Sequence, residues 1–257
     1  MANLLKGKTI FITGATSGFG LAFAKRFAKE GARIVATGRR EDRLHKLKNT
    51  LGSHIHTLTL DVRDQKAVKK AVATLPKTFS NIGVLINNAG LASGIELVPD
   101  TKLSNWEQMI DTNIKGVLYC TDAILPQMVK RDKGHIINLG SVAGNYPYPG
   151  GNVYGGTKAF IKQFSLNLRA DLLGKNIRVT NIEPGMAETE FSLVRFKGDK
   201  SKASAVYKDI KPLSAEDIAE TALFCLTQPA HVNVNTIEVM PVMQAFSGFS
   251  VHRAKKL

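Results

Sequence analysis

Short apolar runs rich in β-branched and aromatic residues alternate along the chain with longer stretches of helical spacing. The short runs predict strands at residues 8–13, 33–37, 55–60, 82–87, 135–140, 177–182 and 235–240. The longer stretches predict helices at residues 21–30, 41–51, 64–74, 104 to about 130, after 152, and 214–227. Strands that alternate with helices are typical of parallel sheets, so we expect one α/β domain over residues 1–257, with a doubly wound parallel sheet of about seven strands.

A glycine-rich turn joins the first predicted strand to the first predicted helix. Glycine lets the backbone approach a phosphate closely, and the start of the following helix presents unpaired N–H groups to a pyrophosphate. The order of strand, glycine turn and helix therefore predicts a dinucleotide site and a Rossmann fold. Its candidate cofactor-binding residues are Gly14, Ala15, Thr16, Ser17, Gly18, Phe19 and Gly20.

The second predicted strand ends at Arg39 and Arg40, where a fold that prefers NAD usually carries an acid. Arginine suits the 2′-phosphate of NADP, so we expect NADP as the cofactor. The alternative is that both side chains only lie at the start of a helix and bind no ligand.

The first fifty residues are strongly basic. They hold eleven Lys and Arg against three Asp and Glu, in a chain of net charge +14, which favours a polyanionic ligand there. Nucleic acid is the competing explanation, but no helix-turn-helix, zinc-finger or aromatic RNA-binding pattern is present.

Small and polar residues follow several of the other predicted strands. Ligands of parallel sheets bind beyond the carboxyl ends of the strands, so these residues should line the site. They are Asp61, Val62, Asn88, Ala89, Gly90, Ser141, Pro184, Gly185, Met186 and Thr189. About 24 residues with little periodicity then precede a helix cap at Ser214 and Asp217, and a stretch of this kind predicts a lid.

Tyr154 and Lys158 lie four residues apart at the start of a predicted helix, so both side chains should share one helix face. A phenol with a pKa of about 10 is a poor acid and a poor base at neutral pH, and a nearby ammonium lowers that pKa. Lowering it by ~3 units requires about 4 kcal/mol. The pair therefore predicts acid/base catalysis. The alternative is coincidence, with the tyrosine in the core and the lysine in solvent.

The long predicted helix carries three further signals. Ser104 and Glu107 should form a capping box at its start. Asn113 falls in its middle, where an asparagine is usually exposed, and Gly116 and Pro126 should bend the helix.

Cysteine, histidine and hydropathy patterns exclude several classes of protein. Cys120 and Cys225 lie in helical apolar patterns without Cys-x-x-Cys spacing, which predicts buried reduced thiols. The six histidines form no ligand-spaced cluster, so no metal is indicated. No stretch is long and apolar enough to span a bilayer, and a strand-like run begins within a few residues of Met1. We therefore expect a soluble cytoplasmic protein with no membrane partner.

Taken together, the motifs resemble the short-chain dehydrogenase/reductase family over nearly the whole chain. They are Thr13-Gly-x-x-x-Gly18-x-Gly20, Asn87-Asn-Ala-Gly90, Asn113, Ser141, Tyr154-x-x-x-Lys158 and Pro184-Gly-x-x-x-Thr189. The resemblance implies hydride transfer between nicotinamide and a carbonyl or alcohol. It implies that Tyr154 acts as the acid and base and that Ser141 holds the substrate oxygen. It also implies that Lys158 binds the nicotinamide ribose and that Asn113 anchors a water in the proton path.

Stretches outside the general motifs look like the bacterial NADP-dependent 3-hydroxy acid dehydrogenases; they include residues 36–40, 146–154, 189–199 and 229–236. Those enzymes act on serine, allo-threonine and related acids, reduce malonic semialdehyde and are typically tetramers. The resemblance implies a small hydroxy acid or semialdehyde as substrate and a homotetramer. A carboxylate needs a paired cation, for which Arg195 in the lid is the first candidate and Arg253 in the tail the second. The alternative is that Arg195 is solvated on a mobile loop.

Two other functions stay open. A 3-oxoacyl-carrier-protein reductase, or another carbonyl reductase, shares the fold, cofactor and motifs, but a long carrier arm needs an open apolar cleft, whereas the lid offers charged residues: Glu188, Glu190, Arg195 and Lys197. An NADP-sensing binding protein is the alternative that is not an enzyme. Such proteins can lose the tyrosine or the lysine, and both are present here.

Overall fold

One parallel sheet runs through the centre of the computed structural model, which describes residues 3–246. Its seven strands follow the order β3-β2-β1-β4-β5-β6-β7. They are β1 (Thr9–Ile12), β2 (Arg33–Gly38), β3 (Ile55–Thr59), β4 (Ile82–Asn87), β5 (Gly134–Leu139), β6 (Ile177–Pro184) and β7 (Thr236–Val239). The order reverses between β1 and β4, where a crevice for a ligand opens at the carboxyl edge of the sheet. The predicted strands and the doubly wound α/β fold are confirmed, and no strand end is shifted by more than two residues.

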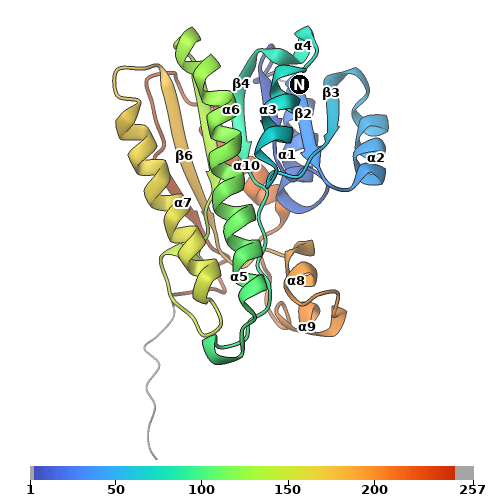
Figure 1. Ribbon diagram of the computed structural model, residues 1–257, viewed down its shortest axis with the longest axis vertical. Helices are drawn as coiled ribbons and strands as arrows, with labels where there is room; N and C mark the ends of the chain where they lie inside the picture. Colours follow the sequence, from blue (N-terminus) through green and yellow to red (C-terminus); the bar gives the residue numbers. More distant parts are fainter. Residues whose placement is uncertain (1–2, 247–257) are drawn as a thin grey trace, which may run out of the picture.

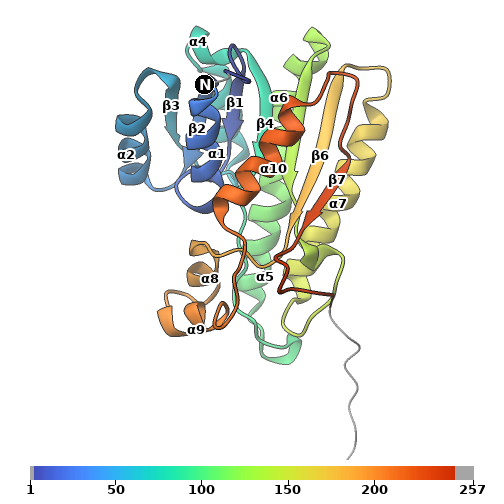
Figure 2. The ribbon, with the colours of Figure 1, turned by 180° about the vertical axis from the view of Figure 1, so that it is seen from behind.

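Helices cover both faces of this sheet (Figures 1 and 2). One face carries α1 (Gly18–Lys29), α2 (Glu41–Leu51) and α10 (Ala215–Thr227). The other carries α3 (Gln65–Ala73), α4 (Lys77–Ser80), α6 (Gly116–Arg131) and α7 (Asn152–Asp171). Short 3₁₀ turns lie at Gly52–His54, Val98–Asp100 and Val142–Gly144. These layers leave the carboxyl edge of the sheet free for a site.

Alternation along β1 divides the core into two apolar clusters. Ile10 and Ile12 pack with α1 and α10 on one face, whereas Phe11 packs with α6 on the other, because successive strand residues point to opposite faces. Each cluster contains one of the two cysteines, Cys120 or Cys225, and both are free and buried, as predicted.

The long helix predicted from 104 to about 130 is instead three segments. The first, α5 (Leu103–Ile110), follows Lys102 and has no side-chain cap, so the predicted capping box is wrong. Tertiary contacts orient its first turn instead: Asn105 accepts a 3.0 Å hydrogen bond from Ser93, and Trp106 donates one to Asn152. The cap predicted at Ser214 and Asp217 is confirmed, with both reciprocal hydrogen bonds present.

A π-helical turn, Asp111–Lys115, separates α5 from α6 and contains Asn113. The wider turn directs this side chain inward, so it is only 2% exposed and the expectation of an exposed asparagine is wrong. Single π turns inside α-helices occur often at functional sites. Here the turn lies beside the carboxyl edge of the sheet.

The unpatterned stretch after Thr189 forms two short helices, α8 (Glu190–Arg195) and α9 (Lys200–Ala205). Figures 1 and 2 show both beyond the carboxyl edge of the sheet, outside its two helical layers. A lid was predicted here, but helices of six residues are too short to give a readable period.

Candidate active site

A cavity of about 600 Å³ opens at the carboxyl edge of the sheet, between the glycine turn and the lid. Most of the residues predicted to bind cofactor or substrate line it: Gly14, Thr16, Ser17, Gly18, Phe19, Arg39, Arg40, Asp61, Val62, Asn88, Ala89, Gly90, Ser141, Tyr154, Lys158, Pro184, Gly185, Met186, Thr189 and Arg195. Three predicted residues, Ala15, Gly20 and Asn113, are outside this lining set. One cavity therefore brings together segments that lie far apart in the sequence.

The glycine turn has the close packing that a phosphate-binding turn requires. Gly14 and Gly18 have φ values of +67° and +50°, which favour glycine. A Cβ on Gly20 would lie 2.6 Å from the side-chain nitrogen Nδ2 of Asn88 and would clash with the carbonyl of Gly14. The backbone N–H groups of Asn88 and Ala89 both donate to Thr13 Oγ1 at 2.9 Å. The turn is thus held against the end of β4, with its backbone facing the cavity, and this geometry fits a dinucleotide pyrophosphate.

The two arginines at the end of β2 have different surroundings. Arg39 lines the cavity and makes no side-chain hydrogen bond or ion pair with residues 3–246, whereas Arg40 is bound on both sides. Arg40 donates to Thr16 at 2.8 Å, to Ser17 at 2.6 Å and to Glu190 of the lid at 2.8 Å. Asp61 is held at 2.6 Å by Arg63, and this hydrogen bond lowers the pKa of the carboxyl.

Sequence reasoning missed Arg43 and did not connect Glu190 with this region. Nη1 of Arg43 lies 2.7 Å from both carboxylate oxygens of Glu190. Arg43 lies in the first turn of α2, three residues after Arg40, which caps this helix; this spacing brings the two side chains to one side of the helix start and could have been noticed. Glu190 lies about 150 residues away in the chain, so no local pattern indicated its partners.

Tyr154 and Lys158 project from the first turns of α7 and are both buried at 8% exposure. The ammonium lies 5.8 Å from the centre of the phenol ring and donates a 2.7 Å hydrogen bond to the carbonyl of Leu139. Both residues therefore belong to the cavity, and the alternative of a solvated lysine does not hold.

Burial dominates the electrostatics of this pair. It raises the pKa of Tyr154 to about 12 and lowers the pKa of Lys158 to about 8. Desolvation thus outweighs the attraction of nearby cations, and the lowering of the phenol pKa expected from a nearby ammonium is not found. Among its neighbours, the Arg195 guanidinium lowers the pKa of Tyr154 most, followed by a hydrogen bond with Ser141.

Ser141 and Asn113 hold the segments around Tyr154 in place. Ser141 Oγ accepts from the N–H of Ala143 at 3.1 Å and faces the cavity. Asn113 accepts from the N–H of Leu91 at 2.9 Å and donates to its carbonyl at the same distance and to Thr157 at 3.0 Å. The π turn is thereby joined to the loop after β4 and to α7. The assignment of Asn113 to a water in the proton path stays a prediction.

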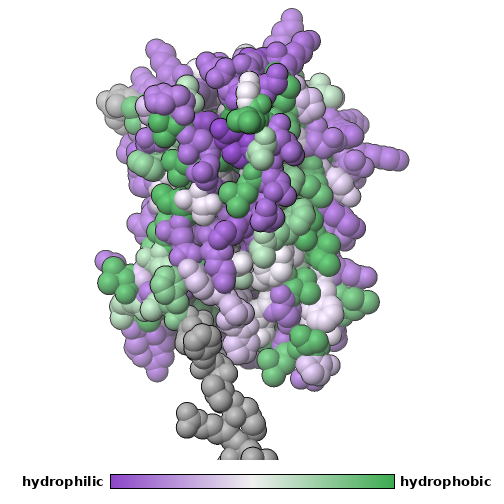
Figure 3. All heavy atoms as spheres, turned by 90° about the vertical axis from the view of Figure 1, so that its left-hand side faces the viewer, coloured by the Kyte–Doolittle hydropathy of each residue, from purple (hydrophilic) through white to green (hydrophobic). Residues whose placement is uncertain are grey.

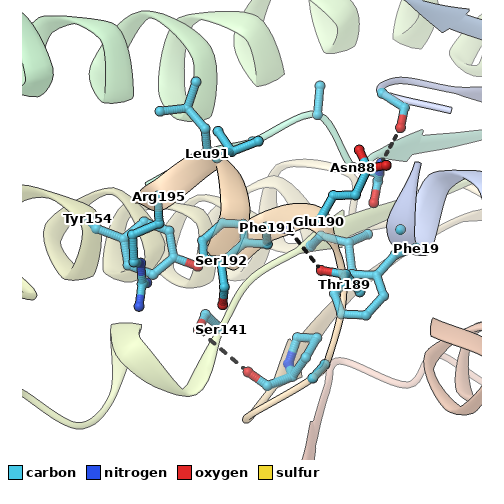
Figure 4. A pocket seen from close by; sticks show the side chains of 18 of the residues that line it. Phe19, Asn88, Leu91, Ser141, Tyr154, Thr189, Glu190, Phe191, Ser192 and Arg195 are labelled. Atoms are coloured by element: carbon cyan, nitrogen blue, oxygen red, sulfur yellow. Dashed lines mark hydrogen bonds between the residues drawn. The ribbon is translucent and has the colours of Figure 1, made fainter. Parts of the chain in front are cut away.

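Arg195 ends α8 and covers the phenol ring (Figure 4). Its guanidinium carbon lies 5.4 Å from the ring centre of Tyr154 and 5.0 Å from that of Phe191, and Nη2 donates to Tyr148 at 3.3 Å. Its Nε is buried and has no hydrogen-bond partner among residues 3–246. This packing excludes the alternative of a solvated side chain. Tyr148 and Phe191 were not predicted, and Arg253 lies outside the described residues.

Among residues 3–246, no group of three or more His, Cys, Asp or Glu side chains is placed to hold a metal ion. In the same part of the chain, no helix combines the length and apolarity needed to cross a membrane.

Comparisons with known proteins agree with this geometry. NADP-dependent 3-hydroxy acid dehydrogenase YdfG of Salmonella typhi is 54% identical over 95% of this chain and 99% of that protein. Serine 3-dehydrogenase of Rhizobium radiobacter is 54% identical over 95% of this chain and 98% of that protein. The solved closed form of serine dehydrogenase complexed with NADP⁺ superposes with a TM-score of 0.95, at 52% identity, over 96% of this chain and 100% of that chain. The short chain dehydrogenase profile matches residues 8–199, and the chain belongs to this family.

Proposed function

We propose that this protein is an NADP-dependent oxidoreductase that transfers a hydride between nicotinamide and the 3-hydroxyl, or carbonyl, of small 3-hydroxy acids. Serine, allo-threonine and the pair of 3-hydroxypropionate and malonic semialdehyde are the expected substrates. One observation carries the proposal: a buried phenol and a guanidinium line the same cavity, 5.4 Å apart, and the guanidinium has an N–H without a partner among residues 3–246. Relatives named for 3-hydroxy acid and serine dehydrogenation support it.

The residues of the cofactor half fit NADP. The glycine turn offers its backbone to the pyrophosphate, and no acid ends β2 to repel a 2′-phosphate. Arg39 has no partner among residues 3–246, and the hydroxyls of Thr16 and Ser17 lie next to Arg40. When bound, the cofactor would supply the hydride donor or acceptor. Lys158, which lines the cavity, is our candidate to bind the nicotinamide ribose of the cofactor.

Proton transfer falls to Tyr154. In reduction, the phenol donates its proton to the carbonyl oxygen of the substrate, and in oxidation the phenolate accepts the proton of the alcohol. Ser141 would hold the reacting oxygen through its hydroxyl. Arg195 has two functions: its guanidinium pairs with the substrate carboxylate and, as a cation, favours the phenolate. In this assignment one residue both selects acids and adjusts the base.

The test is oxidation of L-serine by the purified protein with NADP and NAD in parallel, with a 3-hydroxyacyl thioester as competing substrate. We expect activity on L-serine, preference for NADP, and a much lower kcat/KM for the thioester. A preference for the thioester would favour the carrier-protein reductase, and tight NADP binding without turnover would favour a sensor. Arg39→Ser should raise the Kd of NADP by about tenfold and leave that of NAD within twofold, since one charged hydrogen bond contributes ~1.5 kcal/mol or more.

We further propose a cytoplasmic homotetramer. The two reduced cysteines suit a reducing compartment. Exposed apolar side chains support two separate subunit contacts: Leu103, Ile110, Leu118 and Leu166 on α5 to α7, and Phe224, Val242 and Met243 near the end of the described chain. Apolar patches interrupt the hydrophilic surface on the side of the molecule that carries α7 (Figure 3). Light scattering during gel filtration should give four times the monomer mass of 27.9 kDa, and a monomer would contradict this part of the proposal.

A further inference from the structure

Helix α8 crosses the cavity from the cofactor half to the substrate half. At its start, Glu190 contacts Arg40 and Arg43, which flank the end of β2. At its end, the carbonyl of Arg195 accepts a 2.9 Å hydrogen bond from the N–H of Gly94, and its guanidinium reaches Tyr148. Figure 4 shows Glu190, Phe191 and Arg195 in succession along this helix. A contact at one end of so short a helix can therefore fix the side chain at the other.

Glu190 supplies the negative charge that attracts the lid to Arg40 and Arg43. Glu190 is the only acid inside α8 and α9, which also hold Arg195, Lys200 and Lys202. Without Glu190, all the charged side chains of these two helices would be positive. Its carboxylate lies 2.8 Å from Arg40 and 2.7 Å from Arg43, and these two cations lower its pKa despite partial burial. The carboxylate thus joins two cations of the cofactor half to the lid.

We propose that Glu190, Arg40 and Arg43 form a latch that holds α8 across the cavity and thereby places Arg195 over Tyr154. Glu190 and Arg43 are then positioning residues for a charged substrate, and they contact neither the substrate nor the reacting atoms. Arg40 has a second function, because its remaining donors face Thr16 and Ser17 on the glycine turn. The substrate part of this inference rests on the function proposed above; the latch itself does not.

The test uses Glu190→Gln and Arg43→Gln, singly and together, in the full chain. Limited trypsin digestion without ligand reports the lid directly, through cleavage at Lys197, Lys200 and Lys202. We expect lid cleavage about fivefold faster in Glu190→Gln and in the double variant, and a smaller increase in Arg43→Gln. The KM for L-serine should rise about tenfold, with kcat within threefold and the KM for an uncharged short alcohol within twofold, because only the acid needs Arg195. The double variant should match Glu190→Gln alone, because Arg43 acts only through Glu190, whereas Arg43→Gln alone keeps the contact between Arg40 and Glu190 and should have the smaller effect.

Asp122→Asn is the matched control. Asp122 pairs with Lys69 at 3.0 Å and joins α3 to α6, far from the lid, so its loss should change neither lid cleavage nor KM. Unchanged lid cleavage in both single variants would overturn the latch. So would effects that add in the double variant. An equal rise in KM for the acid and for the alcohol would overturn the positioning of Arg195. If the unmutated protein fails to oxidise 3-hydroxy acids, the proposed function falls, while lid cleavage still tests the latch.

Discussion

The two ends of the sheet both carry buried or half-buried basic groups with shifted pKa values, yet only the carboxyl end holds the candidate active site. At the carboxyl end, burial lowers the pKa of Lys158 and raises that of Tyr154. At the amino end, burial lowers the pKa values of Lys8, His135 and Arg178. A shifted pKa is a recognised signal of a functional site, but here it occurs at both ends.

The partners of the cationic side chains and the size of the neighbouring cavity separate the two ends. Arg178 donates to the carbonyls of Cys225, Leu226, Gln228 and Val232 at 3.1 to 3.4 Å, and Lys8 donates to Leu226 at 3.2 Å. The neighbouring cavity measures only about 180 Å³, against about 600 Å³ at the carboxyl end. There, Nε of Arg195 is buried without a partner in the described chain. The amino end is therefore structural, whereas the carboxyl end keeps a donor and the space for a ligand.

The largest expected effect comes from a substitution that removes the catalytic group at the carboxyl end and leaves the fold intact. Tyr154→Phe removes the transferable proton and keeps the ring packing against Phe191, so kcat should fall by ~10² to 10⁴-fold while the thermal midpoint stays within a few degrees. Steady-state kinetics and a thermal melt measure both. Activity within a few-fold of the unmutated protein would remove Tyr154 from the proton transfer.

The next effect separates the two functions of Arg195. Arg195→Ala should raise the KM for L-serine by roughly 30-fold, because one charged pair contributes ~2 kcal/mol. It also removes the cation that lowers the pKa of Tyr154, so the pH at which oxidation switches on should move upward for every substrate. Arg195→Lys keeps a cation near Tyr154, so the pH at which oxidation switches on should stay near that of the parent. The KM for L-serine should lie between those of the parent and Arg195→Ala. An equal change of KM for L-serine and an uncharged alcohol would indicate a general lid role instead.

The fold and the strand-end residues could be read from the sequence because both depend on local patterns. Apolar runs and the glycine turn located β1 to β7 and most of the cavity lining before any contact was known. The order of strands then places the strand ends at one edge, whatever the side chains do. This is why Ser141, Tyr154 and Lys158 were found together.

Contacts between distant segments could not be read in the same way. The capping box at Ser104 failed because Asn105 and Trp106 are held by Ser93 and Asn152, which outweigh a local cap. Asn113 was expected outside, since a π turn leaves no mark in the apolar period. Likewise, no local pattern indicates that Glu190 pairs with Arg40 or that burial raises the pKa of Tyr154.

A smaller effect tests the structural assignment of the amino end. Arg178→Met should lower the free energy of unfolding by about 2 kcal/mol, because four carbonyls lose a charged donor, while kcat and KM stay unchanged. Arg169→Met is the control. Arg169 lines the same small cavity but makes no side-chain hydrogen bond within residues 3–246, so its loss should shift stability by less than about 0.5 kcal/mol. Loss of activity in folded Arg178→Met would reveal a function at this end.

The smallest effect concerns His135, near the start of β5 and 3% exposed. Its Nε2 lies 2.8 Å from Thr180 Oγ1, and burial, with Arg178 and Lys8 nearby, holds its pKa well below the ordinary value of 6.5. Below that pH the unfolded chain binds a proton that the folded chain does not, so stability must fall as the pH falls. One such group lowers the free energy of unfolding by about 1 kcal/mol between pH 6.5 and pH 5.5.

Urea unfolding at several pH values measures this slope, and His135→Gln should flatten it by the amount that one proton contributes. Glutamine keeps a nitrogen that can reach Thr180 but cannot titrate, so the variant separates charge from packing. His45→Gln, at a side chain that is 67% exposed, is the control for the substitution itself. If His135→Gln unfolds with the slope of the parent, the folded chain must protonate His135 readily. The amino end of the sheet would then hold an accessible titrating group, and the contrast with the carboxyl end would fail at this residue.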